Sequence, residues 1–197
     1  MDIQRRIAEI MAQEAAAISA VKITPAFEAA VLLLRDCTGK VLTTGMGKAG
    51  HVARKFAATL CSTGTPAAYI HPGEAAHGDL GLVGKDDTIV AFSTSGKTNE
   101  VLEMLRLGRH LGLKTIIGIT SHPDSSLREL SDLIIDMGIV NEPCPLGLTP
   151  SASIAVMLAI SDALALTLME VKGITQHDFG LRHHGGYLGR RARTNNE

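Results

Sequence analysis

The sequence predicts an α/β fold in which helices flank a doubly wound, five-stranded parallel sheet. Five short apolar runs, rich in β-branched residues, recur between residues 41 and 137, and helix-like stretches or loops with glycine and proline separate most of them. Strands that are buried on both faces of a parallel sheet have continuous apolar runs of this kind. The length of 197 residues suits one such domain with a substantial core.

Two helices are predicted before the first strand. Apolar residues at near-helical spacing predict an amphipathic helix over residues 2–21. Thr24 and Pro25 are typical of an N-cap followed by proline at the first helical position, and the next helix carries apolar residues from Phe27 to Leu34 on one face. A bare doubly wound sheet needs neither helix, so we expect them to cover the sheet or a partner subunit.

Each apolar run is assigned to one strand of the parallel sheet. In chain order the strands are expected at VLTT (41–44), AAYI (67–70), TIVAF (88–92), TIIGI (115–119) and LIIDM (133–137). A long helix over residues 150–172 follows and ends at Gly173, because glycine is favoured just after a helix. Ser161 and Asp162 interrupt the most apolar part of this segment, so we predict a buried core helix and no membrane span.

The chain is expected to form one domain, residues 1–197, with N-terminal helices (1–36), a core (40–173) and a polar tail (174–197) that contributes to the site. The net charge of −1 and the aromatic content of 3% argue against nucleic-acid and membrane partners. Three cysteines and an N-terminus without an apolar signal segment indicate a cytoplasmic protein.

The stretch GMGKAG, residues 45–50, follows the first predicted strand and has the G-x-G-x-x-G spacing of dinucleotide-binding loops. A dinucleotide site also uses an acidic residue near the end of the second strand. This chain has His71 and Pro72 there, and Glu74 comes too late. The P-loop spacing fails as well, because the required earlier glycine is missing. We therefore favour another phosphate ligand over NAD.

A second loop, STSGKTNE at residues 93–100, follows the third predicted strand and leads into a helix. Ser93, Ser95 and Thr98 supply hydroxyls, and Gly96 lets the backbone turn closely. Backbone N–H groups at the start of a helix favour an anion, and the loop is compact enough for one phosphate. The plain alternative is a Ser/Thr-rich turn that caps the helix, but a cap needs one hydroxyl rather than three.

Four segments stand out in order along the chain and cover about residues 40–191: GMGKAGHVARKFAATLCSTGTPAAYIHPGEAAHGDLG, STSGKTNE, NEPCPLGLTPS and HDFGLRHHGGYLGRR. Together they resemble the sugar isomerase (SIS) domain family and, within it, the D-arabinose 5-phosphate isomerases. The resemblance implies a flavodoxin-like fold and an isomerase that interconverts D-arabinose 5-phosphate and D-ribulose 5-phosphate through an enediol. It also implies a role in Kdo and lipopolysaccharide biosynthesis.

An aldose–ketose isomerase needs a base for the carbon-bound proton, an acid–base group for the oxygens, and a group that holds the developing negative charge. The resemblance implies that Lys48, Glu100, Glu142 and His183 form this catalytic set. From the residues alone each has a plain alternative: a solvated lysine, a carboxylate at a helix start, a surface loop acid and an uninvolved tail histidine. Which glutamate removes the carbon-bound proton stays open.

The other site residues are expected to contact substrate; they are Gly45, Gly47, Glu74, His77, Ser93, Ser95, Gly96 and Thr98. His71, Glu74 and His77 have a spacing that also suits a divalent metal. The resemblance favours a metal-independent enzyme, so we expect no metal and no cofactor. Cys144 is interpreted as a packing residue, because its neighbours in sequence do not indicate an activated thiolate.

Three features depart from the family pattern. Lys97 stands where an acidic residue is usual, Arg182-His183-His184 stands where Ser-His-Pro is usual, and the sequence ends at Glu197 without the regulatory CBS modules. Two alternatives therefore stay open: an isomerase of a hexulose 6-phosphate or sedoheptulose 7-phosphate, and a non-catalytic sugar-phosphate-binding regulator. We expect a small-molecule sugar phosphate as ligand and a homotetramer whose subunits complete one another's sites.

Overall fold

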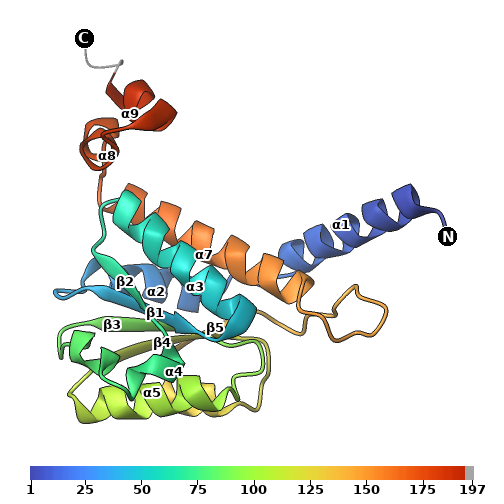
Figure 1. The fold of residues 1–197 in the computed structure, drawn as a ribbon, viewed down its shortest axis with the longest axis horizontal. Coiled ribbons are helices and arrows are strands. Elements are labelled where there is room, and N and C mark those ends of the chain that lie inside the picture. The colour runs from blue at the N-terminus through green and yellow to red at the C-terminus, as the bar shows by residue number, and fades with distance from the viewer. Residues whose placement is uncertain (194–197) are drawn as a thin grey trace.

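Five parallel strands form one sheet in the structure, a computed structural model that describes residues 1–193 (Figure 1). The strands are β1 (Val41–Gly45), β2 (Ala67–Ile70), β3 (Thr88–Phe92), β4 (Thr115–Thr120) and β5 (Leu133–Asp136). Their order is β2-β1-β3-β4-β5, the flavodoxin-like order of a doubly wound sheet. The predicted fold class is therefore confirmed, and each strand overlaps one of the predicted apolar runs.

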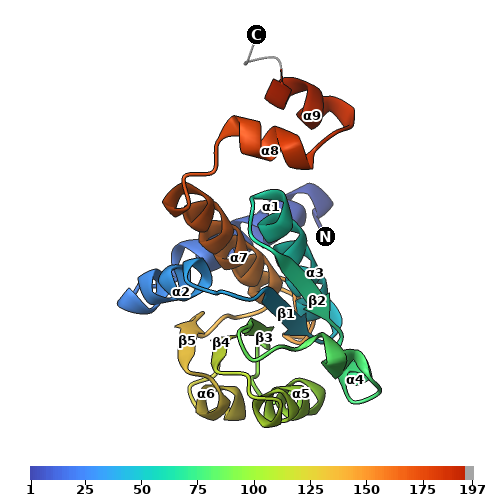
Figure 2. The same cartoon turned by 90° about the vertical axis from the view of Figure 1, so that its left-hand side faces the viewer.

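Helices cover both faces of the sheet, as Figures 1 and 2 show. One face carries α2 (Pro25–Arg35), α3 (Gly47–Ser62) and α7 (Ala152–Val171), and the other carries α5 (Asn99–His110) and α6 (Ser126–Leu130), with the short α4 (Pro72–Ala75) and a 3₁₀ turn (Asp79–Leu82) beside α5. Successive strand residues enter opposite apolar clusters: Val41 packs toward α7 and Leu42 toward α5. The strands lack a polar face because both faces are covered.

Helix α7 lies against α1 (Ile3–Ser19), α2 and α3. Among the described residues it is the one helix long and apolar enough to cross a membrane, with a mean hydropathy of 2.0, but half of that window is buried inside the protein. Met157, Ile160 and Leu164 belong to the main apolar cluster beneath it. Packing inside the protein therefore accounts for about half of this apolar window.

Helix α1 extends away from the body of the molecule and has no buried residue (Figure 1). Asp2 caps its start by accepting the N–H of Arg5 at 3.1 Å. Ile3, Ile7 and Met11 are 64%, 55% and 66% exposed. These three side chains share one helical face, so α1 presents an apolar surface that its own chain leaves uncovered.

The C-terminal segment, which was expected only to be a polar tail, forms α8 (Gln176–Arg182) and α9 (Gly186–Arg193). Thr175 and Asp178 form a capping box at the start of α8, and hydrogen bonds from Thr175 hold the pKa of the Asp178 carboxyl below its usual range. The two helices pack on each other beyond the carboxyl end of α7 (Figures 1 and 2).

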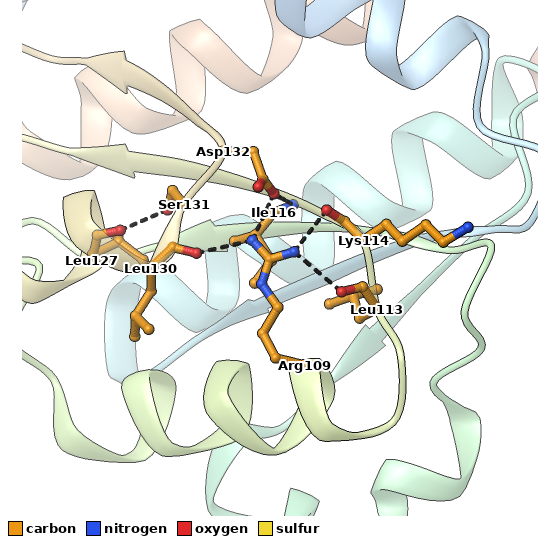
Figure 3. Close-up of polar contacts among 8 residues, drawn as sticks. All are labelled: Arg109, Leu113, Lys114, Ile116, Leu127, Leu130, Ser131 and Asp132. Carbon is orange, nitrogen blue, oxygen red and sulfur yellow. Dashed lines mark hydrogen bonds and ion pairs between the residues drawn. The ribbon is translucent and has the colours of Figure 1, made fainter.

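Arg109 ties together the loops at the amino edge of the sheet (Figure 3). Its guanidinium donates to the carbonyls of Leu113, Lys114 and Leu130, and it pairs with the Asp132 carboxylate at 2.7 Å. The same carboxylate accepts the N–H of Ile116 at 2.7 Å. These hydrogen bonds hold the starts of β4 and β5 together. The candidate site lies at the opposite, carboxyl edge of the sheet.

Candidate active site

A pocket of about 300 Å³ opens at the carboxyl edge of the sheet. Ligands of open α/β sheets bind at this edge, near the point where the strand order reverses. The loops after β1, β3 and β4 and the amino end of α7 build it. Its lining comprises Met46, Lys48, Ala49, Phe92, Ser93, Thr94, Ser95, Thr98, His122, Pro150 and Ile154.

Three helices begin at this pocket: α3, α5 and α7. At the start of α3 and of α5 no side chain of the N-cap residue hydrogen-bonds to the helix. The first N–H groups of a helix lack partners inside the helix and carry partial positive charge. The amino ends of α3 and α5 are therefore suited to bind an anion.

Hydrogen bonds to its own serine and threonine hydroxyls hold the loop after β3 in shape. Ser93 Oγ lies 3.0 Å from Thr98 Oγ1 and accepts the N–H of Gly96 at 3.1 Å, while Ser95 Oγ accepts the N–H of Lys97 at 3.2 Å. Gly96 has φ +61°, and a Cβ there would collide with the Ser125 side chain. The glycine is required both by the turn and by the close approach of α6.

The loop after β1 is a tight strand-to-helix turn. A Cβ at Gly50 would meet the carbonyl oxygen of Gly45 at 2.5 Å, and Gly47 has φ +57°. Tyr69 Oη donates to the same Gly45 oxygen at 2.9 Å and ties β2 to the turn. The turn places the exposed Lys48 in the first turn of α3 at the pocket. The glycine spacing therefore reflects this close packing.

Glu142 caps α7, the third of the helices that begin at the pocket. Its Oε2 accepts the N–H groups of Ser151 and Ala152 at 2.8 Å each, and its Oε1 accepts the N–H of Ser153 at 3.3 Å. Burial acts to raise the pKa of this carboxyl, but hydrogen bonds from Ser153 and Ser151 outweigh it and hold the pKa below its usual range. Glu142 therefore carries a charge at neutral pH.

Glu142 faces a second cavity, of about 890 Å³, between α1 and the segment after β5. The residues that it caps adjoin Pro150, which lines the first pocket. Glu142 thus contacts the residues that follow Pro150 but does not itself line the first pocket. Glu100 is exposed in the first turn of α5, two residues after Thr98, and does not line the pocket.

His183 lies far from the other predicted catalytic residues within the chain. Its ring stacks on Phe179 with centroids 3.9 Å apart, and its Nδ1 lies 2.9 Å from the Phe179 carbonyl oxygen. It follows α8, at the opposite end of α7 from the pocket (Figure 1). Of the four predicted catalytic residues, only Lys48 therefore lines the pocket of its own chain.

The predicted substrate contacts divide into two groups. Ser93, Ser95 and Thr98 line the pocket, and Gly45, Gly47 and Gly96 shape the turns of its two loops. Glu74 and His77 are exposed around α4, outside the pocket lining. Within residues 1–193, no three His, Cys, Asp or Glu side chains gather in a way that would hold a metal ion.

Seven lining residues were not predicted from the sequence: Met46, Ala49, Phe92, Thr94, His122, Pro150 and Ile154. Pro150 and Ile154 come from the start of α7, and nothing in the local sequence points from there to the loops after β1 and β3. His122 follows β4, and the rule that identified the other two loops applies equally to this strand end. A histidine at the carboxyl end of a parallel strand was therefore a usable signal.

The structure also differs from our expectation for Cys144. Its Sγ accepts the N–H groups of Leu148 and Thr149 at 3.3 and 3.2 Å. These bonds, the one from Thr149 foremost, lower the pKa of the thiol to about 7. Cys144 is thus a partly exposed thiol with substantial thiolate character, and packing does not describe it.

The chain is similar in sequence and fold to known proteins. The SIS domain family matches residues 33–167. Arabinose 5-phosphate isomerase KdsD of Pseudomonas aeruginosa is 47% identical over 165 residues, 84% of this chain and 50% of that protein. KdsD of Escherichia coli K12 is 46% identical over 155 residues, 79% of this chain and 47% of that protein. The chain spans about half the length of these curated relatives.

A solved structure of an Escherichia coli CFT073 protein, in complex with arabinose 5-phosphate, has a TM-score of 0.88 and 42% sequence identity to this chain. The similarity covers 92% of this chain and 97% of that one. The family match extends from the end of α2 through most of α7, and so includes every loop that builds the pocket. The chain belongs to the SIS domain family.

Proposed function

We propose that the protein interconverts D-arabinose 5-phosphate and D-ribulose 5-phosphate through an enediol. Relatives named arabinose 5-phosphate isomerase share nearly half of their aligned residues with this chain, and a structural relative was solved with arabinose 5-phosphate bound. The observation that carries the proposal is the pair of helix starts, α3 and α5, whose N-cap side chains make no capping bond at the 300 Å³ pocket. A pocket of this size suits one small ligand.

The phosphate is proposed to bind on the loop after β3. The N–H groups at the start of α5 and the hydroxyls of Ser93, Ser95 and Thr98 supply neutral donors for it. Anchoring the phosphate there orients the sugar carbons that react, because binding energy from a remote group can be used to align the reacting end. Gly45, Gly47 and Gly96 let the backbone come close, and Glu74 and His77 are proposed as outer contacts.

Lys48 is proposed to stabilise the enediolate. During isomerisation a base removes the proton from the carbon beside the carbonyl, and negative charge develops on the oxygen. The Lys48 ammonium, at the start of α3, adds its charge to that of the helix end. The base then returns the proton to the adjacent carbon, and a second group moves the hydroxyl proton.

Glu100 and Glu142 are the candidates for that base. Glu142 is ionised, as a base must be, but its hydrogen bonds to the start of α7 also weaken it as a base. Turnover of Glu100→Gln and Glu142→Gln in deuterated water distinguishes them. The variant that lacks the base no longer incorporates solvent deuterium at the reacting carbon, while the other variant does.

The assembly is proposed to be a homotetramer in which His183 of a neighbouring subunit completes each site. Two observations support this: His183 follows α8, which lies at the opposite end of α7 from the pocket that Lys48 lines, and the apolar face of α1 is uncovered. In a symmetric oligomer each subunit can contribute a residue to its neighbour's site and receive the equivalent residue from a neighbour. We also propose a cytoplasmic enzyme that acts in Kdo and lipopolysaccharide biosynthesis.

The decisive experiment is to incubate the protein with D-ribulose 5-phosphate and measure D-arabinose 5-phosphate. Turnover that is lost in a His183→Ala, Glu142→Ala double variant supports the proposal, and turnover no higher than in that variant contradicts it. A panel with a hexulose 6-phosphate and sedoheptulose 7-phosphate tests the alternative substrates. Binding of sugar phosphate without any turnover would instead indicate a regulator.

A further inference from the structure

His122 is a pocket residue to which the sequence assigned no role. It follows β4, is exposed, and lines the pocket together with Lys48 and the loop after β3. The other polar groups of this lining are hydroxyls, backbone groups and one lysine. His122 is therefore its only imidazole among the described residues, and its ring N–H can donate to an anion in either tautomer.

The backbone that carries His122 is fixed to the loop after β3. The N–H of Ser121 and the hydroxyl of Thr120 both donate to the Thr94 carbonyl, at 3.0 and 3.2 Å. Ser121 Oγ also bonds the Gly138 carbonyl. Because Thr94 itself lines the pocket, any shift of the proposed phosphate loop is shared by the segment that presents His122.

Arg128 of α6 holds the same segment from the other side. Its Nε donates to the His122 carbonyl oxygen at 2.6 Å, and its Nη2 pairs with Asp136 at 2.7 Å. These contacts use the backbone of His122 and leave its imidazole at the pocket. A side chain presented from such a fixed backbone is preorganised for binding, which lowers the entropy lost when ligand binds.

The strand order determines which part of a ligand His122 can reach. β3 lies between β1 and β4, so Lys48 after β1 and His122 after β4 flank the loop after β3 on opposite sides. A sugar phosphate with its phosphate on that loop and its reacting carbons toward Lys48 therefore turns its phosphate toward His122. Charged residues around this segment include Lys48 in the same lining, Asp124 two residues after His122, and Arg128, which bonds the His122 carbonyl.

We propose that His122 is a further substrate-binding residue, which donates a hydrogen bond from its imidazole to an oxygen of the sugar phosphate's phosphate group. This inference rests on the proposed function, which places the phosphate on the loop after β3. It adds a phosphate contact on the side of that loop opposite to Lys48. Its effect is on affinity, because the phosphate binds alike in the ground state and the transition state.

The test compares His122→Ala and His122→Gln with His110→Ala, a matched control in which an exposed histidine at the far end of α5 is removed. His122→Ala is expected to raise KM for ribulose 5-phosphate about tenfold with kcat little changed, the size expected for one hydrogen bond to a charged group. His122→Gln keeps an N–H donor and recovers most of that loss. An unchanged KM in His122→Ala, or a fall confined to kcat, overturns the proposal.

Inorganic phosphate identifies the part of the ligand that His122 contacts. As a competitive inhibitor of the wild-type enzyme it is expected to lose affinity in His122→Ala by the same factor as the substrate. A raised KM with unchanged phosphate inhibition would place the contact on the sugar and contradict the proposal. If the wild-type protein shows no turnover, the proposed isomerase function fails, and calorimetric titration of wild type and His122→Ala with inorganic phosphate still decides whether His122 binds phosphate.

Discussion

The carboxylate of Glu142 closes the amino end of α7 from nine residues away, accepting the N–H of Ser151 at 2.8 Å. It also accepts the N–H of Ala152 at the same distance, so the partial positive charge of this helix end is already neutralised within the chain. The amino ends of α3 and α5 have no such partner from their N-cap side chains. We therefore expect an incoming phosphate to find its donors at α3 and α5, because the amino end of α7 is already occupied by Glu142.

We predict that Glu142→Gln lowers the free energy of unfolding by about 1 kcal/mol at pH 7, the typical value of a helix cap. The pKa of Glu142 in the folded protein lies below its ordinary value of 4.5, so its contribution is complete above pH 4.5 and is lost as the pH falls through the folded value. Urea unfolding of wild type and variant at pH 7 and at acid pH measures this. An equal difference at both pH values would contradict the role of the charge.

Lys48→Ala is predicted to lower kcat of the proposed reaction by about a hundredfold or more, as removal of one group that stabilises an oxyanion does in other enzymes. KM changes less, because the charge that Lys48 stabilises develops only in the transition state. Steady-state kinetics with ribulose 5-phosphate measure both values. Lys114→Ala, an exposed lysine at the amino edge of the sheet, serves as the control and is expected to match wild type. A variant whose loss lies in KM alone would show that Lys48 only binds.

A mixture of two inactive variants is predicted to regain activity if His183 acts across a subunit boundary. After Lys48→Ala and His183→Ala subunits are dissociated, mixed equally and reassembled, about a quarter of the sites combine an intact Lys48 with an intact His183 from the neighbour. Activity near a quarter of wild type supports the shared site. Absence of recovery, with wild-type protein regaining full activity after the same treatment, would show that both residues must come from one chain.

Arg109→Lys is predicted to destabilise the fold by about 2 kcal/mol without changing kcat, because lysine cannot replace the several fixed hydrogen bonds of the guanidinium. The carbonyls to which Arg109 donates lie at the amino edge of the sheet, away from the pocket (Figure 3). Arg35→Lys is the control, since Arg35 is bonded to the exposed Asp36 at the surface, where ion pairs contribute little. Thermal unfolding and kinetics of both variants check this, and equal melting temperatures would contradict it.

The parts of the structure that follow from local chemistry could be predicted from the sequence. Buried β-branched runs identified the strands, and the glycines and hydroxyls of residues 45–50 and 93–100 identified the two loops. The cap that Glu142 makes on α7 had no local signal, because it joins segments separated by a loop with three prolines. Helix α8 was not predicted, because its seven residues QHDFGLR contain few apolar side chains, although Thr175 and Asp178 have capping-box spacing.

Cys144 is predicted to be alkylated faster than Cys61 at pH 7. The N–H groups of Thr149 and Leu148 stabilise its thiolate and lower its pKa to about 7, so about half of the thiol is ionised at that pH. The rate of iodoacetamide modification, followed by peptide mass, is expected to rise from pH 6 to pH 8 and to level off above the thiol pKa. Cys61 is a control because it is more exposed and its Sγ donates to the Ala67 carbonyl. If Cys144 reacted no faster than Cys61, accessibility would govern the rate, and the two backbone hydrogen bonds would not activate the thiol.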